Sequence, residues 1–227
     1  MIPLPGELML PPGRIVERVT LSPEICNRWV QSIVPLLGRS TTTEGRVSID
    51  VGGGRLPLSN VFEGELTAQI LFERLVVTPS GAMQPLVNIL SKIRSIIDPR
   101  LAFGDKGVLL SVRPEPVVVR LGNKRIWHEG LVLDTGMLSV RSNGSVGEDG
   151  SLDMMIEIAF RGDIAAQAPV IAKLLQTPLL IPLRGSVHHP QFDARQVDSI
   201  LKRIVENTAE AVINDGLSRG LEALFGE

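Results

Sequence analysis

Two short groups of residues carry side chains that could ligate a metal ion or transfer a proton. His188 and His189, with Asp193 nearby, offer metal-ligating atoms, and His128 with Glu129 offers an acid and a base. Because neighbouring residues of a strand point to opposite faces, neither pair converges on one ion or one substrate from a regular strand. We therefore expect turn and surface roles for His188 and His189, and neither a metal site nor a catalytic group at either pair.

Other reactive residue types occur without the framework that their chemistry needs. Serine, histidine and aspartate are present, but no Gly-x-Ser-x-Gly elbow holds a nucleophile. The run GGGR at 52–55 is followed by no Lys-Ser/Thr and no helix, so a hairpin turn is expected there rather than a phosphate-binding loop. Cys26 falls on the apolar stripe of an expected helix and is expected to be an inert buried thiol. A non-enzymatic protein without a cofactor is predicted.

Composition narrows the class of protein further. The 227 residues are 44% hydrophobic but only 4% aromatic, without tyrosine, so the apolar side chains are mostly aliphatic. The net charge is −2 and no basic block is present, which argues against a nucleic-acid partner. The first 13 residues lack the features of a signal peptide, and no window offers the roughly 20 apolar residues of a membrane span. A soluble chain without a transmembrane segment is expected, either cytoplasmic or part of a longer protein that carries its targeting segment elsewhere.

Period-two alternation of apolar residues predicts most of the secondary structure. It is clearest over residues 152–160, where every second residue is apolar and acidic residues stand between. This pattern places the apolar side chains on one face of a strand and the carboxylates on the other. Further strands are predicted at 14–20, 47–51, 65–77, 108–113, 117–121, 138–141 and 179–187.

Turn residues indicate how the predicted strands connect. Asn143-Gly144 and Asp149-Gly150 lie between the strand at 152–160 and the strand before it. Both dipeptides accept the positive φ angles of tight turns, so an antiparallel hairpin is predicted.

Helical spacing of apolar residues predicts amphipathic helices that would cover this sheet. They are expected at 22–37, 82–97, 163–176 and from 194 onward. Asp193 stands at the N-cap position of the last helix, with Gln196 as its capping-box partner. The stripe of that helix comprises Val197, Ile200, Leu201, Ile204, Val205, Val212 and Ile213. So large a stripe needs a partner surface, and we expect the sheet rather than another protein or a membrane.

Together these elements predict an α+β fold. It consists of a curved, mainly antiparallel sheet with amphipathic helices on its concave face and ends, and a long C-terminal helix. We expect a single elongated domain over 1–227. Its parts are an extended lead-in at 1–13, a first helix-hairpin unit at 22–99, a central sheet at 108–193 and a C-terminal helix at 194–227.

The sequence PLRGSVHHPQFD at 182–193, followed by a helical stretch that ends in LFG, carries a family pattern. It resembles the C-terminal end of AsmA/TamB-like bacterial envelope proteins, which are similar to the bridge-like lipid-transfer proteins of eukaryotes. The segment 130–160 is similar to their arrangement of short strand, small turn and second strand. The chain is short and lacks the N-terminal anchor of that family, so it corresponds either to a C-terminal portion or to a compact member whose helices fill the groove.

The resemblance implies a curved β-groove, lined with apolar side chains, that shields lipid tails in the periplasm or cell envelope. The side chains expected to contact lipid are Leu66, Ile70, Phe72, Val108, Leu110, Leu138, Val140, Leu152, Met154, Ile156, Ile158 and Phe160. We therefore expect a non-catalytic lipid-binding or lipid-transfer module, with a phospholipid or other acyl-chain ligand and an envelope protein as partners. The alternative is a structural or protein-interaction module of a larger envelope protein, with the groove filled by its own helices. What covers the apolar strand face distinguishes the two.

Overall fold

A computed structural model describes residues 6–22, 33, 35–37, 43–78, 83–97, 110–161, 178–193 and 195–206. The strands of this part are β1 (Glu7–Leu10), β2 (Gly13–Thr20), β3 (Thr43–Pro57), β4 (Glu65–Val77), β5 (Leu110–Val112), β6 (Val117–Gly122), β7 (Arg125–Thr135), β8 (Leu138–Gly147), β9 (Leu152–Phe160), β10 (Leu179–Gly185) and β11 (Pro190–Phe192). The helical elements are α3 (Gln84–Ile97), the short 3-10 turns η2 (Pro35–Leu37) and η3 (Val61–Glu63), and a helix at 195–206.

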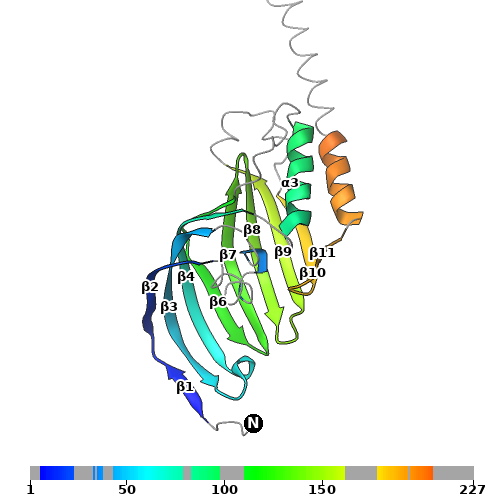
Figure 1. Ribbon diagram of the computed structural model, residues 1–227. Coiled ribbons are helices and arrows are strands. Elements are labelled where there is room, and N and C mark those ends of the chain that lie inside the picture. The colour runs from blue at the N-terminus through cyan, green and yellow to red at the C-terminus, as the bar shows by residue number, and fades with distance from the viewer. Residues whose placement is uncertain are drawn as a thin grey trace, which may run out of the picture.

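The described strands form one curved antiparallel sheet (Figure 1). Its order is β1-β3-β4-β5-β7-β8-β9-β10-β11; β2 also pairs with β3, and β6 pairs with both β4 and β7. The expected helix-hairpin unit and the expected central sheet are thus joined edge to edge, because β4 pairs with β5 and β6. The predicted α+β class with a curved antiparallel sheet is confirmed.

Several expectations fall on residues outside the described part. These are the helix at 163–176, most of the helix at 22–37 with Cys26, the side chain of Val108, and the C-terminal helix beyond residue 206.

The prediction of a turn at GGGR was wrong, because β3 runs without a break through Gly52, Gly53 and Gly54. Glycine is needed here because the neighbouring strand leaves no room for a side chain, and not because the chain turns. A Cβ at Gly54 would lie 2.6 Å from the Leu66 Cδ1 atom and 2.7 Å from the Glu65 carbonyl oxygen on β4. A glycine inside a strand marks such a close approach of neighbouring chains.

The prediction of a turn at Asn143-Gly144 was also wrong, because the strand continues through both residues. Both residues lie inside β8, and the Asn143 side chain accepts a hydrogen bond from the Gly130 N–H of β7 (2.8 Å). The turn at Asp149-Gly150 was correct: Gly150 has φ +76°, and the Asp149 carboxylate accepts from the Ser151 N–H (2.9 Å). The β8–β9 hairpin is therefore longer than the sequence predicted.

A bend at Pro114 and Pro116 interrupts the apolar run of residues 108–121. It separates β5 from β6, and both of these strands lie between β4 and β7. Val112 pairs with Leu133 of β7, whereas Val117 pairs with Ile70 of β4. The bend thus restores the inward orientation of apolar side chains after the two prolines interrupt the strand.

Amphipathic helices cover the concave face, as predicted. From α3, Leu86, Leu90 and Ile93 are fully buried in the same core as the inward strand residues. Figure 1 shows α3 and the helix at 195–206 at the end of the sheet that holds β9, β10 and β11. Among the described residues no helix has the length and the apolar character needed to cross a membrane.

The N-cap predicted at Asp193 is present at the start of the helix at 195–206. The Asp193 carboxylate accepts from the backbone N–H groups of Arg195 (3.0 Å) and Gln196 (3.3 Å), which is an N-cap. The Gln196 amide also donates to the Leu180 carbonyl oxygen of β10 (3.5 Å). The expected stripe needs one correction, because Val205 is 49% exposed and faces away from the sheet.

Candidate functional site

The candidate site is the concave apolar face of the sheet, which we call the apolar face. Directly paired residues of antiparallel strands point to the same side. Leu66 of β4 pairs with Leu121, Leu121 with Ile126, Ile126 with Val146 and Val146 with Leu152. This row crosses from β4 to β9 without an outward residue. The apolar face is therefore continuous across the middle of the sheet.

Register places the described residues of the predicted lipid-contacting set on this one face. Their inward orientation follows from alternation along each strand and from direct pairs such as Val140 with Ile158 and Leu138 with Phe160. The side chains that are almost completely buried are Ile70, Phe72, Leu110, Leu138, Val140, Leu152, Met154, Ile156 and Ile158. Leu66 and Phe160 are half-buried, and Asp153 and Glu157 lie on the opposite face of β9.

Within the described residues, three parts of the chain cover the apolar face. These are α3, the helix at 195–206 through Val197, Ile200 and Ile204, and η2 through Leu37. All their buried side chains belong to the same core as the inward strand residues. In this conformation most of the apolar face is therefore a filled interior rather than an open groove, and Leu66, Leu121 and Ile126 at one end of it are half-buried.

A buried polar pair lies within the apolar face. His128 of β7 is 2% exposed, and its Nε2 atom lies 2.9 Å from the Oγ atom of the buried Ser142 on β8. Its Nδ1 atom has no well-aligned hydrogen-bond partner within the described residues. Burial lowers the pKa of His128 to about 4, against a smaller opposing effect of the Ile33 backbone. At neutral pH the imidazole is therefore uncharged.

A β-bulge sets the surroundings of this pair. The β7–β8 register shifts between His128 and Leu131, and Gly130 adopts φ +86° there. As a result His128 and Leu131 both face inward although they are three positions apart, while Glu129 lines the opposite face. The structure thus separates the acid–base pair considered from the sequence. The alternation of Ile126 with His128 is the sequence signal that could have placed His128 on the inner face.

The opposite, outer face carries a pocket of about 420 Å³. Trp127 and Met155 line it, and both are partly exposed. Its two arginines each face a carboxylate: Arg184 pairs with Asp153, and Arg120 lies 4.0 Å from Glu129. The charges of this outer pocket are therefore balanced. Sequence reasoning missed it, because four different strands contribute the charged side chains.

The histidines that the sequence singled out do not gather with other ligands. Among the described residues no three His, Cys, Asp or Glu side chains lie close enough to hold a metal ion together. His188 and His189 are exposed in the β10–β11 connection, where the Ser186 hydroxyl accepts from the His189 backbone N–H (3.2 Å).

Comparisons of the chain with family models, with curated proteins and with solved structures find no match.

Proposed function

We propose that the chain is a non-catalytic lipid-binding or lipid-transfer module that holds an acyl chain against the apolar face. The observation that carries the proposal is the continuity of this face, which crosses from β4 to β9 through directly paired aliphatic side chains. The resemblance to AsmA/TamB-like proteins supports the same function. It also supports a place in the bacterial cell envelope and an envelope protein as partner.

An aliphatic wall suits acyl chains for a physical reason. Burial of a methylene group contributes about 0.8 kcal/mol and needs no particular direction, so chains of different length and unsaturation are held alike. An acyl chain at the apolar face would take the place of the apolar side chains that now cover it, and its methylene groups are equally apolar. Moving the cover therefore exchanges one apolar contact for another instead of exposing the sheet to water.

The helix at 195–206 is the part of the cover that can be tested most directly. Val197 is 8% exposed and faces the sheet, whereas Val205 in the same helix is 49% exposed. Val197→Asp buries a carboxylate against the apolar face and should release the helix. Val205→Asp makes the same chemical change on the solvent side and serves as the matched control.

The measurement is the affinity for a fluorescent fatty acid, together with native mass spectrometry of the purified full chain. We expect copurified lipid in the wild-type protein, tighter probe binding by Val197→Asp and unchanged binding by Val205→Asp. Lipid-free wild-type protein, with no probe binding by either variant, would contradict the proposal.

Burial of the apolar face favours a second candidate, a structural or protein-interaction module of a larger envelope protein. In that case α3 and the helix at 195–206 are permanent parts of the core. Val197→Asp should then lower the stability by several kcal/mol without creating probe binding, as burial of an unpaired charge does in any core. Urea unfolding of both variants, run beside the probe assay, separates the two candidates.

A further inference from the structure

Three arginines on neighbouring strands line a pocket of about 860 Å³ on the outer side of the sheet. Arg18 comes from β2, Arg46 from β3 and Arg74 from β4. Register brings them together, because Arg46 pairs with Thr20 on one side and with Glu73 on the other. Ser111, Val112 and Pro114 complete the wall. The volume lies within the range of roughly 300–1,000 Å³ typical of small-molecule sites.

Two of these arginines adopt a backbone conformation that arginine seldom takes. Arg18 has φ +49° and Arg74 has φ +53°, and the strand register shifts next to each of them. The left-handed region costs a residue with a Cβ atom free energy that glycine or asparagine largely avoids. Strained residues of this kind concentrate at binding sites, where the side chain is needed in that place.

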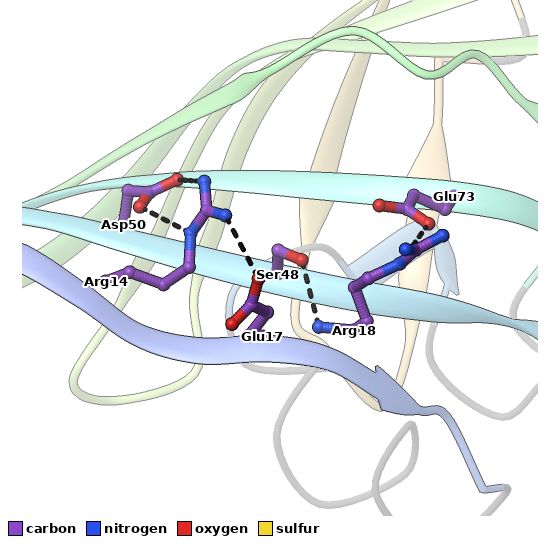
Figure 2. Close-up of polar contacts among 6 residues, drawn as sticks. All are labelled: Arg14, Glu17, Arg18, Ser48, Asp50 and Glu73. Carbon is purple, nitrogen blue, oxygen red and sulfur yellow. Dashed lines mark hydrogen bonds and ion pairs between the residues drawn. The ribbon is translucent and has the colours of Figure 1, made fainter.

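Charge within the pocket is not balanced. Arg18 donates from Nε to a Glu73 carboxylate oxygen (3.2 Å), and its backbone N–H donates to the Ser48 hydroxyl (3.0 Å), as Figure 2 shows. Of the described residues that line the pocket, Glu73 alone is acidic, against three arginines. Within the described residues neither Arg46 nor Arg74 forms an ion pair, and both side chains reach solvent.

The next arginine along β2 provides a contrast. Arg14 holds the Asp50 carboxylate with two hydrogen bonds, of 2.9 and 3.0 Å, and lies 3.7 Å from Glu17 (Figure 2). Its positive charge is therefore neutralised by its neighbours. The outer pocket beside Trp127 is balanced in the same way. The excess of positive charge is thus a property of the Arg18–Arg46–Arg74 pocket and not of every arginine on this face.

We infer that the Arg18–Arg46–Arg74 pocket binds a phosphate group of an anionic ligand. The planar guanidinium group presents paired N–H donors that match phosphate oxygens, and phosphate supplies the negative charge that the pocket lacks. The phosphate belongs either to a soluble phosphoester or to a phospholipid headgroup at a membrane surface. The inference does not rest on the acyl-binding proposal, because it concerns the opposite face of the sheet.

The test uses the full chain and a double variant, Arg46→Gln with Arg74→Asn. Asparagine tolerates the left-handed region, so this change removes charge without adding strain, and the variant should melt no lower than the wild type. Arg141→Gln is the matched control, because Arg141 is an exposed arginine of β8 outside the pocket. Binding is measured at low ionic strength, since surface charges are screened by salt.

Calorimetry with inorganic phosphate and with glycerol 3-phosphate reports the soluble source. Sedimentation with vesicles of phosphatidylcholine, with and without phosphatidylglycerol, reports the headgroup source. We expect binding to at least one of these anionic probes, weakened about tenfold or more in the double variant and less than twofold in Arg141→Gln.

The probe that binds identifies the source of the phosphate. The inference is wrong if no anionic probe binds the wild type, or if Arg141→Gln weakens binding as much as the double variant does. In the latter case the protein responds to net charge alone. Neither result depends on whether a fatty-acid probe binds the apolar face.

Discussion

His128 shows how a single residue can link burial to a dependence of stability on pH. Its imidazole lies in the apolar face with a pKa of about 4, whereas the unfolded chain exposes it with an ordinary value near 6.5. The unfolded state therefore binds a proton over a range of pH in which the folded state does not. The contribution of His128 to the free energy of unfolding is fully present above about pH 6.5 and is lost as the pH falls toward 4.

The expected loss is large enough to measure. Between pH 7 and pH 5 the shift corresponds to about 2 kcal/mol of unfolding free energy. His128→Asn should flatten the dependence of the unfolding free energy on pH over this range. His189→Asn, which changes an exposed histidine, should leave that dependence as in the wild type. Urea denaturation of the three proteins at both pH values provides the comparison. Identical pH profiles for wild type and His128→Asn would show that the histidine is charged or accessible in the folded protein.

At the scale of the element, glycine decides how closely two strands approach. Gly144 of β8 has φ +148°, and a Cβ there would lie 2.5 Å from the Met154 Cα atom and also against the Asp153 carbonyl oxygen of β9. Gly150, in the turn between the same strands, has φ +76° but open space around it. The two glycines thus serve one hairpin for different reasons.

Alanine substitution should separate these two roles. Gly150→Ala adds only the backbone penalty of the left-handed region, about 1 kcal/mol. Gly144→Ala adds a clash with the backbone of β9 and should destabilise the protein by about 3 kcal/mol or more. Urea unfolding measures both, with the wild type as reference. Equal losses for the two variants would mean that β9 moves aside without resistance.

These glycines also explain which elements the sequence could predict. Period-two alternation correctly identified the inward residues of β9, since alternation depends only on the strand itself. Asn143-Gly144 and the glycine run in β3 were assigned to turns, because glycine serves both turns and close strand contacts and the sequence does not distinguish them. The bulges at Arg18, Gly130 and Arg74 depend on the register of neighbouring strands, so local sequence did not reveal them.

The same limit applies to the candidate sites. The apolar face could be predicted residue by residue, because each strand carries its own share of it. The Arg18–Arg46–Arg74 pocket could not be predicted from the sequence. Arg46 lies 28 positions from each of the other two arginines, and the three meet only through the pairing of β2, β3 and β4.

At the scale of the whole molecule, one core joins both parts of the chain. Its buried residues extend from Leu21, next to the end of β2, to Ile204 of the last described helix, through α3 and the central strands. We therefore expect one cooperative unfolding transition rather than separate transitions for the segments 22–99 and 108–193. Tryptophan fluorescence and far-ultraviolet circular dichroism should give the same urea midpoint. Two separated midpoints would show that the sheet divides between β4 and β7.

The strand order of the sheet closely follows the order of the chain, and this bears on how the protein is made. Each strand from β3 onward pairs with a strand that the ribosome has already released or with the next one or two to emerge. The sheet can therefore grow one hairpin at a time during synthesis, without waiting for a distant partner. The helix at 195–206 follows all the described strands, so the part of the apolar face that Val197, Ile200 and Ile204 cover lacks these contacts until that helix emerges. Until then, a nascent chain presents to chaperones the same surface that we propose for lipid.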